Sequence, residues 1–316
     1  MASQWLKSAI TKPTLSEIRS QLIPRIAALV PPSGEIATAF TGLTLFCKTA
    51  PSPCYLASVE PSLSIFLQGK KRINVGPDEF LCDDSSFLVS CIDVPIQSQI
   101  IEASQDVPQV SMRLGLNMPT VREVLSREDV PEFKAGSARR GLSVGRTTLG
   151  LLNAATRLID LLETPEDIPF LGHLIEREIV YRILKTPQGQ RLRDIATTGN
   201  LSHRAAKAIT WLSANYARPL RMEELAEIAR MGVSTLHHQF RTLTAMSPLQ
   251  FQKQLRLQAA RQRMLLDDID ATSAAYEVGY ESVSQFNREY SRMFGQPPKR
   301  DIKALRDSKV VSIGAA

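Results

Sequence analysis

The sequence predicts an α+β protein built from two domains, and three observations support this prediction. Between residues 36 and 116, short apolar runs alternate with turn residues, which is typical of a β-sandwich or β-barrel. In the last third, two helical segments repeat with an offset of 50 residues. The length of 316 residues suits two domains of about 100–200 residues each. We therefore place a β-rich domain with a helical hairpin in residues 1–190 and an all-α domain in residues 200–316.

Charge is divided unevenly between these two domains. From residue 200 onward, 17 Lys and Arg side chains oppose 11 Asp and Glu, whereas residues 1–199 carry 21 of each sign. The formal net charge of +6 therefore belongs entirely to the last third. A basic domain joined to a neutral one favours an interaction with nucleic acid, although solvated helices also carry Lys and Arg.

The remaining composition sets the class of protein. No apolar run approaches the roughly 18 residues that a membrane span requires. The N-terminal sequence MASQWLKSAITK lacks the apolar core of a signal peptide. We therefore expect a soluble, cytoplasmic protein without a membrane partner. The four cysteines lie in the first domain and include no CxxC pair, which predicts reduced thiols and no disulfides.

The first domain is expected to begin with an amphipathic helix within residues 1–30, followed by six or more short strands. Gln68–Lys70 and Val75–Asp78 carry the glycines typical of turns between strands. Further along the chain the spacing of apolar residues becomes helical, and residues 149–162 and 169–184 predict a hairpin of two helices. This hairpin is either a dimer surface or a cover that packs on the barrel.

The repeat in the last third consists of two similar segments. Residues 225–240 read LAEIARMGVSTLHHQF, and residues 275–290 read AYEVGYESVSQFNREY. Each has a short amphipathic run, a break that contains glycine, and a second run that ends in an aromatic residue. Two such units predict two helix-turn-helix motifs in one domain. We also expect a preceding helix that Ser202 caps and that reaches Tyr216, and a connecting helix that Ser247 caps.

In a helix-turn-helix motif, the second helix enters the major groove of DNA. Spacing of i and i+4 places four large residues inward, and the polar residues between them then face outward. The inward residues are Leu236, Phe240, Phe286 and Tyr290. The outward candidates for DNA contact are Ser234, His237, His238, Arg241, Ser282, Ser284, Gln285 and Arg288, with Lys253 and Arg256 of the connecting helix as candidates for phosphate contact.

These segments resemble the AraC/XylS family of bacterial transcription regulators, in which two helix-turn-helix units are paired across a connecting helix. The resemblance covers roughly residues 202–306. It implies double-stranded DNA and RNA polymerase as partners. The sequence departs from the family pattern at Gly232, where serine is usual, at His238, often arginine, and at Ser291, usually lysine. The matching residues are Leu225, Ala226, Ser234, Leu236, Phe240, Ser247, Pro248, Arg256, Leu257, Ala260, Gly279, Tyr280, Ser282, Ser284, Phe286, Arg288, Phe294, Gly295 and Pro298.

The first domain resembles the cupin-like sensor domain of an AraC subfamily, through the stretches PSLSIFLQGKKRINVG and FLVSCIDVPIQSQIIEAS. The resemblance extends to aldehyde-responsive members. It implies a homodimer that binds a small-molecule effector in a cupin-like β-barrel and activates transcription. Cys54, Cys82 and Cys91 lie in or beside predicted strands, which makes them candidates for effector contact through a reactive thiol.

Two alternative functions compete with this hypothesis. A metal-dependent cupin enzyme would need a His-rich cluster inside the barrel, but the first histidine is His173, beyond the strands. We therefore predict no metal, no cofactor and no catalytic residue. The second alternative is a constitutive DNA-binding protein whose first domain binds no ligand. Within the first domain, Lys70-Lys71-Arg72 suits a solvated hairpin turn better than a site for an anionic effector.

Overall fold

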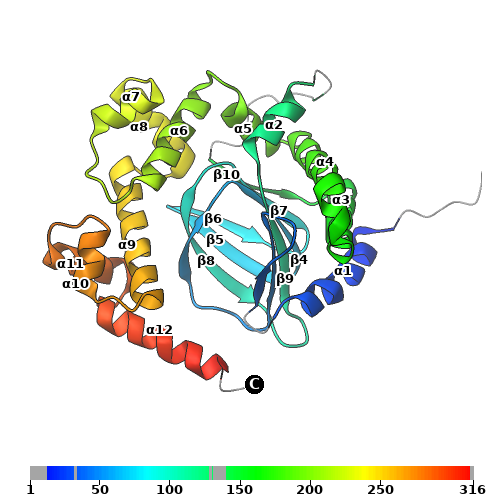
Figure 1. The fold of residues 1–316 in the computed structure, drawn as a ribbon, viewed down its shortest axis with the longest axis horizontal. Helices are drawn as coiled ribbons and strands as arrows, with labels where there is room; N and C mark the ends of the chain where they lie inside the picture. Colours follow the sequence, from blue (N-terminus) through cyan, green and yellow to red (C-terminus); the bar gives the residue numbers. More distant parts are fainter. Residues whose placement is uncertain (1–12, 32–33, 128–129, 131–139, 314–316) are drawn as a thin grey trace, which may run out of the picture.

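The computed structural model describes residues 13–31, 34–127, 130 and 140–313. Its first half contains two antiparallel sheets that face each other, with helices outside them (Figure 1). The predicted α+β class with an N-terminal β-rich domain is confirmed. The six-stranded sheet has, in spatial order, β1 (Glu35–Ala37), β2 (Leu43–Lys48), β9 (Gln109–Gly115), β4 (Ser62–Gln68), β7 (Ser86–Ser90) and β10 (Leu142–Arg146). The four-stranded sheet has β3 (Tyr55–Val59), β8 (Val94–Glu102), β5 (Lys70–Val75) and β6 (Asp78–Cys82).

Glycines form both of the predicted turns. Gly69 joins β4 to β5 with φ +77°, and a Cβ atom there would lie 2.7 Å from the carbonyl oxygen of Glu102. Only glycine fits this turn, because both the dihedral angle and the close backbone exclude a side chain. Gly76 joins β5 to β6 with φ +57°. Strand β10 was not expected from the sequence, because a segment of five residues next to helices is too short to show a clear alternation of apolar and polar residues.

The two faces of the six-stranded sheet differ in burial, because successive residues of a strand point to opposite sides. Leu45, Met112 and Ile65 are aligned across β2, β9 and β4, and each is at most 1% exposed. On the opposite face of the same strands, Phe46 and Arg113 are only partly buried. This second face looks toward the four-stranded sheet, since Lys71 of β5 reaches the ring of Phe46.

Helices cover the buried face of the six-stranded sheet (Figure 1). The first begins with a capping box, in which Thr14 Oγ1 accepts from Glu17 N at 3.2 Å and a carboxylate oxygen of Glu17 accepts from Thr14 N at 2.7 Å. It is the helix expected within residues 1–30, of which residues 1–12 lie outside the described part. The helices of this layer are α1 (Leu15–Leu29), α2 (Met118–Leu125), α3 (Leu149–Asp160) and α4 (His173–Leu184).

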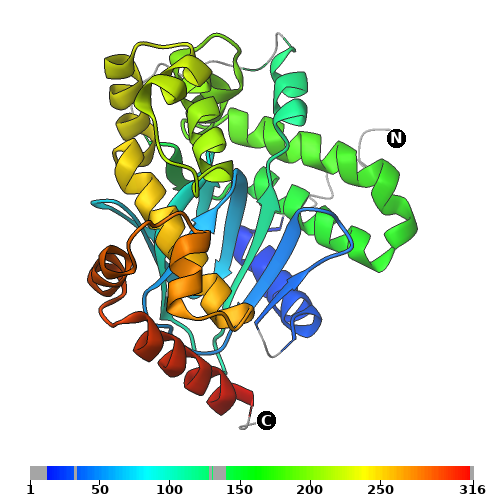
Figure 2. The same ribbon diagram turned by 60° about the vertical axis from the view of Figure 1, so that its left-hand side comes forward.

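The α3–α4 pair is the predicted helical hairpin (Figure 2). Three short turns join its helices, namely η1 (Leu161–Glu163), η2 (Pro165–Asp167) and η3 (Ile168–Gly172). Within the described ranges, no helix is both long and apolar enough to cross a membrane.

The last third is helical, as predicted. The long helix α9 runs beside β3 and β8, with α8 packed near one end and α10 near the other (Figures 1 and 2). The helices are α5 (Gly189–Ala196), α6 (Leu201–Ala214), α7 (Met222–Ala229), α8 (Val233–Thr244), α9 (Pro248–Leu266), α10 (Ala271–Glu277), α11 (Val283–Phe294) and α12 (Pro298–Ile313).

The start of α6 differs from the sequence prediction. Asn200, and not Ser202, is the N-cap, because Asn200 Oδ1 accepts from Ser202 N at 3.0 Å. The hydroxyl of Ser202 is buried and accepts from Arg191 Nη1 at 2.9 Å. The helix ends at Ala214, short of the expected Tyr216.

Apolar contacts connect the first helix-turn-helix unit to the β-rich domain. One cluster of buried side chains extends from Leu45 of β2 through Leu192 of α5 to Phe240 of α8. A separate cluster, which includes Phe286 and Tyr290, forms the core of the second unit. The predicted boundary between residues 190 and 200 therefore falls inside a continuous core, whereas the second unit packs around its own.

Candidate nucleic-acid interface

The first helix-turn-helix unit consists of α7, a tight turn and α8. The helix α7 ends at Ala229, and its C-cap Arg230 has a φ of 51°, in the left-handed region. Gly232 is the N-cap of α8 and offers no side-chain hydrogen bond, which is the weaker cap expected from the sequence. Leu236 and Phe240 are fully buried, and the Phe240 ring packs edge-on against Phe251 of α9 at a centroid distance of 5.3 Å. The buried Phe240 ring therefore fixes the orientation of α8, and with it the direction of the outer face of this helix.

The second unit repeats this arrangement with a better cap. Ser282 Oγ accepts from Gln285 N at 3.3 Å at the start of α11. Gly279 in the preceding turn has φ +90°, and a Cβ atom there would lie 2.0 Å from the carbonyl oxygen of Ala217. Phe286 and Tyr290 are fully buried. The four inward positions predicted for the two helices are thus confirmed.

The polar residues between these anchors face away from the core. The side chains of His237, His238 and Arg288 make no hydrogen bond or ion pair with another residue in the described part of the chain. Their donors are available to a ligand outside the molecule. Of the predicted DNA contacts, Ser234, His237, His238 and Arg241 are exposed on α8, and Ser284, Gln285 and Arg288 are exposed on α11. Contact of these residues with DNA stays a prediction.

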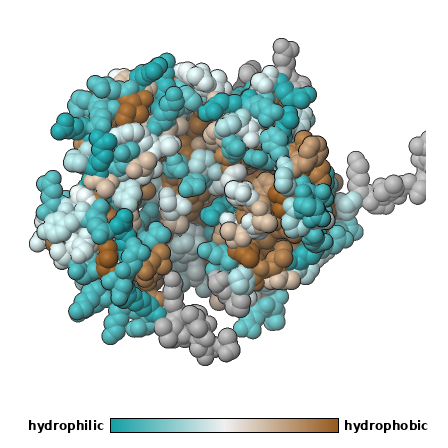
Figure 3. Space-filling model, viewed as in Figure 1, coloured by the Kyte–Doolittle hydropathy of each residue, from teal (hydrophilic) through white to brown (hydrophobic). Residues whose placement is uncertain are grey.

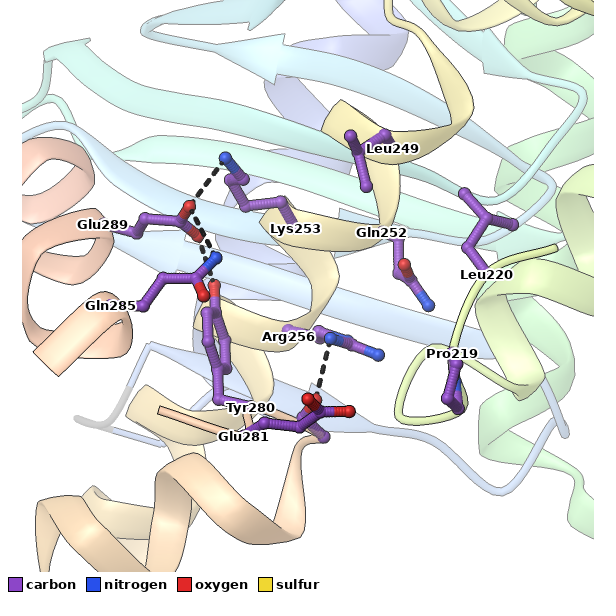
Figure 4. A pocket seen from close by; sticks show the side chains of 11 residues that line it. Pro219, Leu220, Leu249, Gln252, Lys253, Arg256, Tyr280, Glu281, Gln285 and Glu289 are labelled. Atoms are coloured by element: carbon purple, nitrogen blue, oxygen red, sulfur yellow. Dashed lines mark hydrogen bonds and ion pairs between the residues drawn. The ribbon is translucent and has the colours of Figure 1, made fainter. Parts of the chain in front are cut away.

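The sequence predicts a phosphate contact for Arg256, but the structure gives its side chain other partners. Its guanidinium lies between the loop before α7 and the turn before α11 (Figure 4). Nε donates to Tyr216 O at 2.7 Å, and Nη1 donates to Gly279 O at 2.9 Å. Nη2 donates to Arg218 O at 2.9 Å and to Ala217 O at 3.1 Å. Arg256 thus ties the two helix-turn-helix units together from the helix that connects them.

Lys253 and Gln285, two predicted DNA contacts, converge on Glu289 of α11 (Figure 4). Lys253 Nζ lies 2.9 Å from Glu289 Oε1, and Gln285 Nε2 donates to the same oxygen at 3.3 Å. The hydroxyl of Tyr280 donates to Glu289 Oε2 at 2.8 Å. Burial alone would raise the pKa of Glu289, but the hydrogen bonds from Lys253, Tyr280 and Gln285 outweigh it and lower the pKa. The carboxylate therefore stays ionised and links α9 to α11.

Sequence reasoning did not identify Glu289 or Asp301 as parts of this interface. Asp301 of α12 is 7% exposed and accepts from Arg261 Nε and Nη2, each at 2.7 Å, and from the Tyr290 hydroxyl at 2.7 Å. An acidic residue inside a basic helical domain is the sequence signal that points to such internal pairing. These pairs fix α11 against α9 and α12.

The candidate effector residues of the first domain are dispersed. Cys82 and Cys91 are at most 2% exposed, and burial raises the pKa of each thiol to about 12, so both are protonated at neutral pH. Cys54 is exposed just before β3. Burial therefore argues against a reactive thiolate at Cys82 and Cys91. The described residues contain no group of three or more His, Cys, Asp or Glu side chains that could hold a metal ion.

Comparison with known families and proteins accounts for both halves of this architecture. Residues 39–191 match the N-terminal domain of AraC-type transcriptional regulators, and residues 225–304 match a helix-turn-helix domain. The chain belongs to the AraC family of transcription regulators. The family resemblance predicted from the sequence, including the sensor module, is thereby confirmed. The first domain corresponds to the N-terminal domain of AraC-type regulators, and the last third carries the helix-turn-helix domain.

Individual relatives agree with this family. The chain is 27% identical over 164 residues to the HTH-type transcriptional activator RhaS from Salmonella schwarzengrund. That match covers 52% of this chain and 58% of RhaS, so it spans little more than half of the relative.

Two solved structures of ToxT from Vibrio cholerae have the same fold at 10% identity. The structure of a ToxT point variant in its apo form gives a TM-score of 0.55 and covers 84% of this chain and 98% of ToxT. Wild-type ToxT bound to an unsaturated fatty acid gives 0.54 and covers 85% and 95%. At this identity, the likeness supports the two-domain fold alone.

Proposed function

We propose that this AraC-family protein is an effector-responsive transcription activator that reads two successive major-groove segments. The observation that supports the proposal most directly is the pair of exposed polar surfaces on α8 and α11. Each surface stands opposite a fully buried aromatic anchor. Because α9 connects the two units and Arg256 ties them together, the two surfaces have a fixed separation. A rigid pair of recognition helices suits two grooves of one duplex.

The chemistry of these residues fits base and phosphate contact. Arg288 offers a planar guanidinium that pairs bidentately with guanine, the most common specific contact to a base. Ser234, His237 and His238 provide shorter donors and acceptors on α8. Arg241, near the end of α8, suits a phosphate. We expect the two helices to lie about 34–36 Å apart, one turn of DNA, on the same side of the duplex.

The β-rich domain is the proposed effector-binding part. RhaS is named as an activator, and ToxT has been solved with an unsaturated fatty acid, which supports a regulator that senses a small molecule. Contacts between the domains offer a route for the signal. Arg140 pairs with Asp78 of β6 and also donates through Nη1 to Arg241 O at the end of α8, at 3.0 Å. An effector that alters the β5–β6 turn would change the orientation of α8.

We further propose a homodimer formed through the end of the α3–α4 hairpin. Phe170 is 75% exposed, and Leu171 and Leu174 beside it are 38% and 47% exposed. Apolar side chains gather over this region at the right of Figure 3. A second copy that covers the patch would remove it from water. Analytical ultracentrifugation should show a dimer for the wild type and a monomer for Phe170→Asp, and an unchanged dimer would contradict this surface.

Selection of DNA from a random-sequence library with the purified full-length protein tests the reading of two segments. Hydroxyl-radical footprinting of the selected sequence should show two protected segments on one side of the duplex, about one helical turn apart. A single protected segment, or recovery of DNA without a shared sequence, would contradict the proposal. RNA polymerase recruitment is then testable by transcription in vitro from a template that carries the selected site.

A further inference from the structure

Two cations from opposite sheets approach one aromatic ring inside the β-rich domain. Lys71 shares the inward face of β5 with Ile73 and Val75, which are at most 2% exposed. Its Nζ lies 6.0 Å from the centroid of the Phe46 ring on β2. The guanidinium carbon of Arg113, on β9, lies 5.3 Å from the same centroid. The Lys70-Lys71-Arg72 triplet is therefore not one solvated surface, since its central residue points between the sheets.

Neither of these cations has a carboxylate partner among the described residues, whereas both neighbours of Lys71 do. Lys70 Nζ lies 2.7 Å from Glu102 Oε1, and Arg72 Nε lies 3.1 Å from Glu79 Oε2. The inward-facing positions around the pair are neutral apart from Lys48 of β2, a further cation two residues beyond Phe46. The neutral positions are Thr44 and Phe46 on β2, Ser64 on β4, Cys82 on β6, Ser98 and Ile100 on β8, and Ser111 on β9.

The interior around the pair is polar and not fully buried. Thr44, Phe46, Ser64 and Arg113 are partly exposed, although they lie on central strands of a sheet whose other face is almost fully buried. Deeper in, Ser98 is 1% exposed, and its hydroxyl makes no hydrogen bond with a described residue. The ring and the two cations are thus partly accessible.

Two like charges held near one ring repel each other, and the repulsion is stronger where water is partly excluded. The face of Phe46 attracts cations through its quadrupole but cannot neutralise them. The missing component is an anion. Because Arg presents paired donors that match a carboxylate, and Lys adds a second charge, an organic carboxylate suits this arrangement better than a neutral ligand.

We propose that the space between the sheets is a binding site for a small organic carboxylate, held by Arg113 and Lys71 with its apolar part against Phe46. The proposal rests on the proposed function, because it names the chemical class of the effector that the sensor domain takes.

The test is isothermal titration of the full-length protein with acetate, hexanoate and benzoate, and with the matched neutral amides of each. We expect at least one carboxylate to bind about tenfold more tightly than its amide. Lys71→Met and Arg113→Met should each weaken that binding about tenfold or more, and Lys71→Arg should retain it. Lys70→Met is the matched control, since it removes a charge from the same turn on the outer face. It should change the affinity less than about twofold.

Circular dichroism and thermal melting of each variant identify loss of fold, and Lys71→Arg keeps the test informative if a Met variant fails to fold. Equal affinity for carboxylates and amides, no carboxylate binding up to about 10 mM, or unchanged binding in both Met variants would overturn the site. DNA binding provides a separate outcome. A carboxylate that binds but leaves affinity for selected DNA unchanged supports the site and contradicts an effector-responsive function. If a neutral compound changes the affinity for DNA while no carboxylate binds, the effector-responsive function is supported and the carboxylate site is contradicted.

Discussion

The guanidinium of Arg256 donates to the carbonyl oxygens of four residues. Its removal leaves those of Ala217 and Gly279, one in each loop, without this donor, while Gln252 still donates to the other two. We expect Arg256→Ala to lower the free energy of unfolding by roughly 1–3 kcal/mol. Arg256→Lys should be similarly destabilised, because an ammonium cannot donate to both loops in this geometry. The slope of log affinity against log salt for selected DNA should stay as in the wild type. A loss of about 0.9 in that slope, restored by Lys, would instead make Arg256 a phosphate contact.

Arg288 is exposed on α11, and its side chain makes no hydrogen bond or ion pair with a described residue, which leaves it available to a base. Arg288→Ala should cost roughly 1–3 kcal/mol of DNA-binding free energy at one base pair and relax the preference there. Affinities for a library of single-base variants of the selected DNA measure this. Arg292 is the matched control, because it is exposed on the same helix one turn later. An equal loss for every DNA variant would make Arg288 a backbone contact that carries no sequence preference.

The sequence predicted correctly which residues are buried where the spacing along one helix determines the burial of a side chain. Phe240 and Tyr290 are buried because i and i+4 positions share one face of a helix. The roles of Arg256 and Lys71 could not be predicted in this way. The partners of Arg256 lie 23–40 residues away along the chain. The direction of Lys71 depends on the phase of β5, since a shift of one residue reverses every side chain of a strand.

At the scale of elements, Glu289 joins α11 to α9 and its pKa gives this contact a pH dependence. The pKa is lowered in the folded protein, so folding favours the ionised carboxylate. The resulting stabilisation is complete above the ordinary value of 4.5 and is lost as pH falls through the lowered pKa. We expect Glu289→Gln to be less stable than the wild type by about 1 kcal/mol at neutral pH. Chemical denaturation should show the difference shrinking at acidic pH, and a constant difference would contradict the role of the charge.

Helices, strands and turns were predictable when their own sequence carried a repeat of apolar residues, a capping residue or a glycine. The α3–α4 hairpin and the β4–β5 turn belong to this group. Strand β10 became visible only through its pairing with β7, from Leu142 opposite Ser90 to Arg146 opposite Ser86. The short helix α5 likewise gains its stability from tertiary contacts, as expected for a helix of eight residues.

At the scale of the molecule, the β-rich domain and the first helix-turn-helix unit share one apolar core. Gly141 N donates to Leu243 O at 2.8 Å, and Gln258 Nε2 of α9 donates to Ala57 O of β3 at 3.3 Å. The second unit has its own core. A change in the sensor is therefore expected to move α8 first, while α11 follows through Arg256.

The position of α5 between the two halves makes the domain boundary testable. Leu192 and Ile195 of α5 are at most 5% exposed, and His203 Nδ1 of α6 lies 2.8 Å from Ile195 O. A fragment from Asn200 to Ala316 lacks these contacts, whereas one from Thr186 keeps them. Because burial of one such side chain contributes about 1.5–3 kcal/mol, the longer fragment should be the more stable. Both should prefer selected DNA over random DNA, more weakly than the full-length protein.

Thermal melting and DNA titration of the two fragments make the comparison, with Ile195→Ala in the longer fragment as the control that should remove most of its advantage. Equal stability would show that α5 belongs to the sensor and that residues 197–200 are the true boundary. A folded fragment that binds selected and random DNA equally would mean that sequence preference depends on the docked sensor domain. That result would fit the contact between Arg140 and the end of α8, because the sensor would then hold the first recognition helix in its reading position.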